Sequence, residues 1–289
     1  MQLTFWQQEA VKSNDSDTVV NVASVPQRSL FRYPGGKTWF IPTLRKWLGY
    51  YPASLLVEPF AGGGVVGLTA VCENLTRKVE LVELDEEVAA VWEVLINGDI
   101  EILCKKILQF HMNVENVELE LERPEKSIYD IAFSTILKNR VFHGGILAKG
   151  SGMIKNGENG KGLSSRWYPS TLVKRIQAIA FVRNKISFIN GDGFERIEHY
   201  KENKDVFFFV DPPYYHAGKR LYNHYDIDHE RLFNIIASVK GRFVMTYDNN
   251  LEILKLADKY GLKYTRILMK TTHHLSKEEI VLSDSLDWL

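Results

Sequence analysis

Short apolar runs, separated by polar segments and turn residues, recur along this chain and predict an alternating α/β fold. The run Val206–Val210 lies between polar Lys204-Asp205 and Pro212-Pro213, which indicates a buried strand that ends in a rigid loop. Similar runs predict strands near 55–58, 79–83, 186–190, 206–210, 242–247, 264–270 and 279–282, with helices between most of them. Since residues 271–279 are too few for a right-handed crossover, the last two strands should form a hairpin. We therefore expect a seven-stranded sheet that is parallel except for one strand of that hairpin.

A glycine-rich turn follows the first predicted strand. The segment 55–64 is an apolar strand that enters the loop Ala61-Gly62-Gly63-Gly64, and a helix should run from Val65 to about Asn74. Glycines at such a turn let the backbone approach a ligand and leave helix N–H groups available. The next strand ends in acids, and Glu83 lies where a carboxylate binds ribose hydroxyls in nucleotide-binding sheets. A nicotinamide dehydrogenase would show much the same pair of features.

A second glycine turn lies upstream, in Tyr33-Pro34-Gly35-Gly36-Lys37. Its Gly-Lys-Thr resembles a phosphate-binding P-loop, but Phe31 stands where the first glycine is required and no apolar strand precedes it. The aromatic ring and the lysine suit a small zwitterion instead, because Lys37 can pair with a carboxylate and Tyr33 can pack against an amine. A helix start with a glycine turn is the structural alternative.

The tetrapeptide Asp211-Pro212-Pro213-Tyr214 follows the most apolar strand and has groups suited to a flat base. Asp211 and the Pro212 carbonyl can accept the two hydrogens of an exocyclic amine, while Tyr214 stacks on the ring. Ligands bind at this end of the strands in open α/β sheets. The structural alternative is a strand-ending Pro-Pro turn with a capping Asp.

Composition limits the remaining choices. The 289 residues are 45% hydrophobic and 12% aromatic, enough for one large α/β domain with a smaller insertion. Cys72 and Cys104 stand in neither a metal-ligand nor a redox spacing, and His273-His274 are adjacent, which excludes the common zinc motifs. With no long apolar run and no signal-peptide layout, we expect an intracellular protein without a membrane segment. Residues 1–30 are weakly patterned and should form an N-terminal extension.

Charge is balanced overall but uneven along the chain. Lys+Arg and Asp+Glu number 36 each, yet residues 134–185 hold ten bases and one acid, a local charge of +9. Such a segment predicts phosphate binding that weakens with salt. Its glycines, with Asn156-Gly157 and Asn159-Gly160, predict a hairpin or loop. The candidate DNA-binding side chains are Asn139, Arg140, Lys149, Lys155, Lys161 and Arg166.

Taken together, the motifs at 33–37, 58–64, 83 and 211–214 resemble those of the Dam-like, D12-class DNA adenine-N6 methyltransferases, in the order of the α-group. The resemblance covers roughly residues 30–283 and implies a Rossmann-like methyltransferase sheet with an inserted, mostly helical DNA-recognition domain. We expect the catalytic domain at 31–97 and 184–289 and the recognition domain at 98–183. Where many relatives have Trp, this chain has Tyr33, which keeps the aromatic face.

The resemblance implies the cofactor S-adenosylmethionine and a set of site residues. Asp211, Pro212, Pro213 and Tyr214 would be catalytic. Glu58 would orient the cofactor's amine or cap the loop, and Tyr247 would line the base pocket. The cofactor would contact Tyr33, Gly35, Gly36, Lys37, Glu58, Phe60, Ala61, Gly62, Gly63, Gly64, Glu83, Asp192 and Asp211. Asp192 in its Gly-Asp-Gly turn has an equally simple structural explanation.

The implied activity is site-specific methylation of N6 of a flipped-out adenine in double-stranded DNA, without a metal. An RNA adenine-N6 methyltransferase and a catalytically silent DNA-binding regulator are the alternatives. Methylation of cytosine at C5 is excluded, because neither cysteine follows a proline. We also expect a cognate restriction endonuclease as partner and a cytoplasmic, nucleoid-associated location in a prokaryotic or phage-encoded system.

Overall fold

The structure is a computed structural model of the whole chain, in which part of the N-terminal extension and a few loops are not described. The described residues are 25–32, 36–124, 126–148, 150–157, 160, 162–214, 226–270 and 276–289. Several predicted site residues, Tyr33, Gly35, Lys149 and Lys161, therefore lie outside them. Most of the predicted extension at 1–30 and the pair His273-His274 lie outside them as well.

The described residues form one seven-stranded sheet in the order β3-β2-β1-β4-β5-β7-β6. Its first five strands run parallel, and β7 pairs antiparallel with both β5 and β6. The strands are β1 (Ala53–Glu58), β2 (Thr76–Glu83), β3 (Ile186–Asn190), β4 (Val206–Val210), β5 (Phe243–Asp248), β6 (Lys263–Lys270) and β7 (Ser276–Ser283). The predicted strands, their directions and the final hairpin are confirmed.

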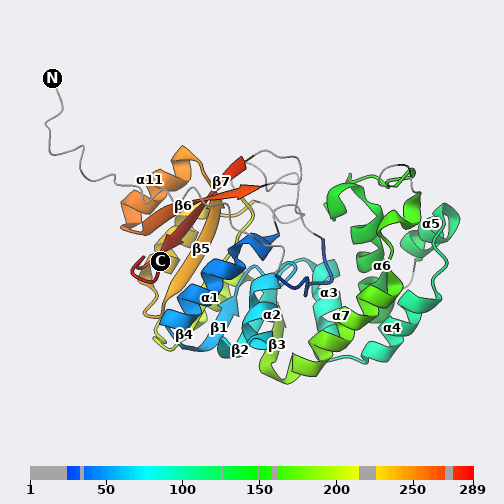
Figure 1. The fold of residues 1–289 in the computed structure, drawn as a ribbon, viewed down its shortest axis with the longest axis horizontal. Coiled ribbons are helices and arrows are strands. Elements are labelled where there is room, and N and C mark those ends of the chain that lie inside the picture. The colour runs from blue at the N-terminus through cyan, green and yellow to red at the C-terminus, as the bar shows by residue number, and fades with distance from the viewer. Residues whose placement is uncertain are drawn as a thin grey trace, which may run out of the picture.

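Helices cover both faces of the sheet, which is why the central strands are apolar throughout. In β4 every residue is buried. One face packs on α8 (Gly193–Tyr200), α10 (His229–Ser238) and α11 (Leu251–Tyr260). The other face packs on η2 (Lys37–Phe40), α1 (Ile41–Tyr50), α2 (Val65–Cys72) and α3 (Glu86–Ile96), as Figure 1 shows.

The segment between β2 and β3 forms a helical lobe at one end of the molecule (Figure 1). It contains α4 (Ile100–Gln109), α5 (Val114–Glu122), α6 (Ile128–Val141) and α7 (Pro169–Val182), with short 3-10 helices η3 (His143–Gly145), η5 (Leu163–Arg166) and η6 (Arg183–Lys185). Ser127 begins α6 with a capping box, in which its hydroxyl accepts from the Asp130 backbone N–H. The boundary at residues 98 and 183 stays a prediction.

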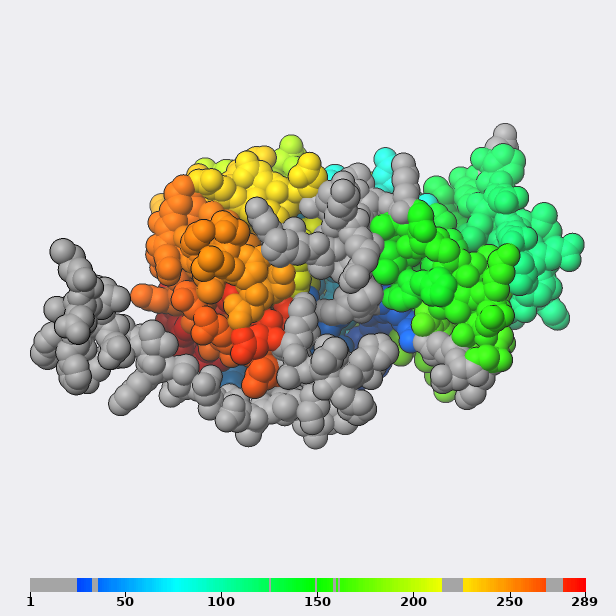
Figure 2. Space-filling model, turned by 90° about the horizontal axis from the view of Figure 1, so that it is seen from above, coloured from blue at the N-terminus to red at the C-terminus, as the bar shows by residue number. Residues whose placement is uncertain are grey.

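The helical lobe shares its hydrophobic core with one face of the sheet. A single buried cluster runs from Trp47 and Phe209 through Trp92 of α3 to Phe133 and Ile176 of the lobe. Helix α3 packs on α6, and α4 packs on α7. The lobe is therefore fixed to the sheet by apolar packing. In Figure 2 the lobe (green) and the C-terminal helices (orange and yellow) lie at opposite ends, with the blue N-terminal part visible between them.

The glycine-rich segment after α6 is mostly turns. Phe142 pairs with Met153 through an isolated antiparallel bridge, so only the start of the predicted hairpin is present in the described residues. Within the described ranges, no helix is both long enough and apolar enough to span a bilayer.

Candidate active site

Four acidic residues stand at the carboxyl ends of neighbouring parallel strands and line one cavity. Glu58 ends β1, Glu83 ends β2, Asp192 follows β3, and Asp211 follows β4. Strand β1 pairs with β2 on one side and with β4 on the other, so the strand order reverses between β1 and β4. Open sheets bind ligands at such a switch point. The cavity has a volume of about 960 Å³, which is within the usual range of ligand pockets.

The glycine loop after β1 is held in shape by Trp92 of α3. Gly62 and Gly64 have positive φ, at 46° and 58°, which favours glycine. The Trp92 indole Nε1–H donates to the Gly62 carbonyl at 2.9 Å. A Cβ added to Gly64 would lie 2.6 Å from the Trp92 ring. The loop thus needs glycine both for its backbone and for its approach to α3.

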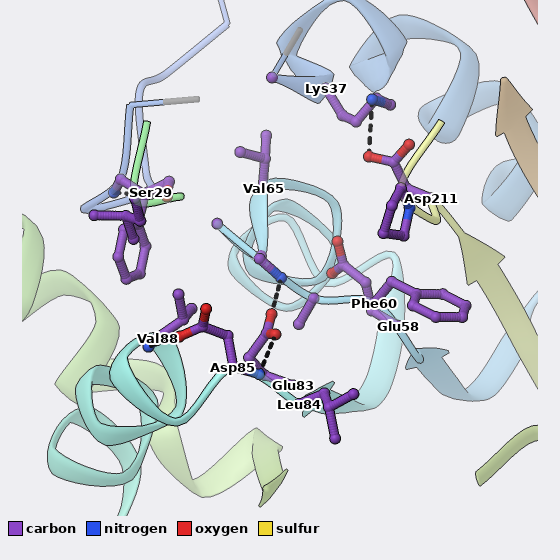
Figure 3. A pocket seen from close by; sticks show the side chains of 18 of the residues that line it. Ser29, Lys37, Glu58, Phe60, Val65, Glu83, Leu84, Asp85, Val88 and Asp211 are labelled. Carbon is purple, nitrogen blue, oxygen red and sulfur yellow. Dashed lines mark hydrogen bonds and ion pairs between the residues drawn. The ribbon is translucent and has the colours of Figure 1, made fainter. Parts of the chain in front are cut away.

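Glu83 joins the loop to the second strand. Its carboxylate accepts from the Gly62 N–H at 2.8 Å and from the Asp85 N–H at 2.9 Å, as Figure 3 shows. Burial raises the pKa of Glu83 to about 7, against the lowering by these backbone bonds. Asp85 caps α3 and also lines the cavity. Asp192 caps α8 by accepting from the Phe194 N–H at 2.8 Å.

Glu58 lies deeper, beneath the loop. Its side chain is 3% exposed and accepts from the Gly67 N–H of α2 at 2.8 Å. Burial raises its pKa to about 8, and the nearby Asp211 carboxylate adds to the increase. A carboxyl in this position is protonated near neutral pH and serves as a neutral cap for the start of α2.

Asp211 is held from two sides. Its Oδ2 pairs with Lys37 Nζ at 2.8 Å, and its Oδ1 accepts from the Thr246 hydroxyl of β5 at 2.8 Å (Figure 3 shows the lysine pair). The side chains of Lys37 and Asp211 are 10% and 19% exposed. The predicted catalytic carboxylate and the lysine of the upstream glycine turn, far apart in the sequence, are thus neighbours.

Tyr214 lies behind Asp211 rather than in the open cavity. Its ring stacks on Tyr247 of β5, with centroids 5.8 Å apart and planes inclined by 26°. Lys37 Nζ stands 5.0 Å from the centre of the Tyr214 ring. Burial, with the carboxylates of Asp211 and Glu279, raises the pKa of Tyr214 well above its usual range. Tyr247 is fully buried and its hydroxyl bonds His229 Nδ1 at 2.8 Å.

The structure brings most of the predicted cofactor residues together, while their roles remain predictions. The cavity is lined by Gly36, Lys37, Glu58, Phe60, Ala61, Gly62, Gly63, Gly64, Glu83, Asp192 and Asp211. Of the other catalytic residues predicted, Pro213 lines it, whereas Pro212, which is buried, and Tyr214, which is partly buried, do not.

The prediction that Asn139 contacts DNA needs correction, whereas the prediction for its neighbour Arg140, which lines the cavity, stays a prediction. Both are buried, at 1% and 4% exposure, and their polar groups bind protein atoms. The Asn139 amide accepts from the Arg32 N–H and donates to the Arg32 and Gly145 carbonyls. Arg140 donates to the Leu30 carbonyl and to Asn139 Oδ1. Asn139 has no surface for DNA, while Arg140 reaches only the cavity wall, where Arg166 also lies. Lys155 is exposed on the lobe.

Sequence reasoning missed several side chains that shape the site. Thr246 holds Asp211, Trp92 supports the glycine loop, and Arg175 and Arg231 line the cavity. Trp92 and Arg231 belong to no motif. Thr246 lies in the strand-end segment 245–249, of which only Tyr247 was predicted to line the base pocket, and Arg175 lies in the basic segment 134–185.

Comparison with known proteins supplies the family. The model of the D12 class N6 adenine-specific DNA methyltransferases matches residues 33–281. The chain therefore belongs to this family, and it is an adenine-specific, S-adenosylmethionine-dependent methyltransferase. No curated protein matches the sequence significantly.

The solved structures that this chain resembles are distant from it. The rRNA methyltransferase AviRa from Streptomyces viridochromogenes has 12% identity and a TM-score of 0.41, covering 92% of this chain and 97% of its own. Precorrin-6y C5,15-methyltransferase from Geobacter metallireducens has 10% identity and a TM-score of 0.35, covering 93% and 94%. M. capricolum TrmK, in complex with its cofactor product S-adenosylhomocysteine, has 8% identity and a TM-score of 0.35, covering 83% and 66%. All three TM-scores are below 0.5, so these neighbours decide nothing about the site.

The residues that line the cavity fit S-adenosylmethionine. Gly62, Gly63 and Gly64 line the cavity, and Glu83 and Asp85 offer carboxylates where ribose hydroxyls are bound in such folds. Among the described residues, no three His, Cys, Asp or Glu side chains come together as metal ligands.

Proposed function

We propose that this chain methylates N6 of an adenine in double-stranded DNA, at a specific sequence, after the base is flipped into the cavity beside Asp211. The observation that carries the proposal is the fixed Asp211 carboxylate at the end of β4, in the same cavity as the glycine loop. Since adenine N6 lies inside the duplex, an enzyme that acts on it has to extrude the base.

Asp211 and Pro212 would activate the amine. The lone pair of adenine N6 is delocalised into the ring, and two acceptors draw the amine toward tetrahedral geometry. Each oxygen of Asp211 has two acceptor positions, so its bonds to Lys37 and Thr246 leave capacity for an amine hydrogen. Pro212 has no N–H, so the loop presents its carbonyl without a competing donor.

Electrostatics and positioning then suffice for the transfer. S-adenosylmethionine, when bound, supplies a methyl group on a positively charged sulfur. The amine would accept this methyl group on its nitrogen and would lose a proton afterwards. Asp211 therefore need not be a strong base, since it acts as an acceptor that orients N6.

Tyr214 would support the base from behind. The Tyr214 ring stacks on Tyr247, and Lys37 lies over the ring. A flipped base that displaces neither neighbour would therefore contact the remaining edge of this ring. The aromatic pair therefore provides a firm apolar wall for the flipped base.

The test is methylation-sensitive sequencing of plasmid from a methylation-free host. The host would express the wild type, Asp211→Ala, or Asp205→Ala, in which the replaced side chain is exposed at the opposite end of β4. We expect N6-methyladenine at one short motif with the wild type and Asp205→Ala, and a loss of at least about a hundredfold with Asp211→Ala. Methylation of an RNA stem-loop but not of duplex by the purified wild type would overturn the DNA substrate. Cofactor binding with no turnover on either would indicate a silent regulator.

A further inference from the structure

Four arginines converge on the end of the cavity that faces the helical lobe. They come from separate elements: the segment before the upstream glycine turn, α6, η5 and α7. The group, called here the arginine cluster, is Arg32, Arg140, Arg166 and Arg175. The proposed transfer of a methyl group uses none of them.

Several hydrogen bonds of the cluster use neutral oxygens as acceptors. Arg175 donates to the Ser29 carbonyl at 2.9 Å, and Arg166 donates to the Phe142 carbonyl at 3.2 Å. Arg140 donates to the Leu30 carbonyl and to the Asn139 amide oxygen. Within the parts of the chain that the structure describes, neither Arg140 nor Arg175 forms an ion pair with a carboxylate.

The cluster is electrostatically costly as it stands. Burial, followed by the charges of Arg175, Arg32 and Arg166, lowers the pKa of Arg140 to about 9. Burial and then the charge of Arg32 lower the pKa of Arg175. Buried cations that face other cations are stabilised when an anion joins them.

A phosphodiester fits this environment better than other anions. The planar guanidinium forms bidentate bonds with phosphate. Each guanidinium has five N–H donors, and Arg175 uses one of them for its bond to the Ser29 carbonyl. Three of the four arginines belong to the basic segment 134–185, which is the part expected to face DNA. In base flipping, the backbone on either side of the extruded nucleotide stays close to the mouth of the base pocket.

We propose that the arginine cluster binds a backbone phosphate next to the flipped adenosine, so that the strand is held while the base enters the cavity. This inference rests on the proposed function and adds a contact that sets the position of the strand. The other anion of the reaction is the carboxylate of the cofactor, which has Lys37 as its predicted partner on the Asp211 side of the cavity.

The experiment is a phosphate scan combined with Arg175→Gln. The probe is a duplex of the sequence that the wild type methylates, with single phosphates near the target adenine replaced by neutral methylphosphonates. For the wild type we expect one substitution to weaken binding about 10- to 100-fold, the usual range for a charge-assisted hydrogen bond. Arg175→Gln should bind the unmodified duplex more weakly than the wild type does, by the same factor. The methylphosphonate should then reduce the affinity of Arg175→Gln by less than about a further twofold.

Salt dependence and matched variants complete the test. Arg175→Gln should reduce the slope of log affinity against log salt by about 1, whereas cofactor affinity should stay within about twofold. Arg183→Gln, an exposed arginine outside the cavity, is the control and should show no coupling to any phosphate. Arg175→Lys keeps the charge without the fork and should recover only part of the affinity.

Three outcomes would overturn the inference. The first is a wild-type scan with no sensitive phosphate beside the target, which needs no variant at all. The second is independence of the two changes, in which the methylphosphonate weakens the DNA binding of Arg175→Gln as much as it weakens that of the wild type. The third is a loss of cofactor affinity with DNA affinity unchanged, which would assign the cluster to the cofactor carboxylate. Site-specific methylation would persist in each of these cases, whereas a wild type that binds no duplex would refute the proposed function itself.

Discussion

Asp211 is positioned by residues from two distant parts of the chain. Lys37 comes from the first glycine turn and Thr246 from the middle of β5, and both contact the carboxylate at 2.8 Å. The ammonium of Lys37 balances the negative charge of Asp211. The hydroxyl of Thr246, which is fully buried, fixes the rotation of the carboxylate. A carboxylate that is held in this way loses little orientational freedom when it accepts an amine hydrogen.

Replacing Thr246 by valine should therefore slow methyl transfer. Valine has nearly the same shape but no hydroxyl, so Asp211 loses a bond worth roughly 1.5–3 kcal/mol. We expect kcat to fall about tenfold or more, with KM for S-adenosylmethionine within about twofold, while Thr246→Ser keeps most of the activity. Steady-state kinetics on duplex DNA checks this, and equal changes in kcat and KM, or a serine variant as slow as valine, would contradict it.

At the scale of elements, α6 connects the helical lobe to the cofactor side of the site. The Asn139 side chain binds both the N–H and the carbonyl of Arg32, and it also holds the Gly145 carbonyl. A Cβ on Gly145 would lie 2.3 Å from the Arg32 carbonyl oxygen, so the close approach requires glycine. Since Arg32 immediately precedes the segment 33–37 in the sequence, α6 holds the chain at the point where it enters that segment.

Asn139→Ala should consequently weaken cofactor binding although Asn139 does not line the cavity. The change removes two part-buried hydrogen bonds, to the N–H and the carbonyl of Arg32, at roughly 0.5–1.5 kcal/mol each. We expect KM for S-adenosylmethionine to rise about five- to fiftyfold, with a lower Tm. The control is Asn97→Ala, which removes an exposed amide that donates to Glu93. Cofactor affinity equal to that of the wild type, measured by calorimetry, would show that this connection has no functional effect.

For the molecule as a whole, buried carboxyls couple stability to pH. Burial raises the pKa of Glu58 from 4.5 to about 8 and that of Glu83 from 4.5 to about 7. Both groups bind a proton more tightly in the folded chain than in the unfolded chain. The resulting stabilisation is fully present below a pH of about 4.5 and is lost as the pH rises through the folded pKa values.

The cofactor-free protein should thus have a higher Tm at about pH 6 than at about pH 8.5. A difference of about 1 kcal/mol would correspond to roughly 2–4 °C for a chain of this size. Glu58→Gln, which is neutral at every pH, should reduce the difference. Glu73→Gln is the control, because Arg45 lowers the pKa of Glu73 and that carboxyl does not titrate in this range. Calorimetric scans that show the same pH dependence in wild type and Glu58→Gln would refute the coupling.

The sequence alone determined the positions of the strands, the direction of the final hairpin and the motifs that line the cavity. Apolar runs such as Val206–Val210 predicted strands because burial on both faces requires unbroken apolar sequence. The final hairpin followed from the short connection between its strands. The sequence also identified Asp211, Lys37, Glu83 and the glycine loop. Each of them lies in a short motif at a strand end or a glycine turn, which can be recognised without knowing the rest of the fold.

Only the tertiary structure decided which of these residues meet and which are buried. The partner of Asp211 in β5 depends on the pairing of β4 with β5, and the burial of Asn139 and Arg140 depends on packing of the lobe against residues 29–32. A charge pattern counts cations but cannot tell a buried guanidinium from a solvated one. The reason is physical: periodicity records the immediate environment of each element, whereas these contacts join residues separated by 35 to 110 positions.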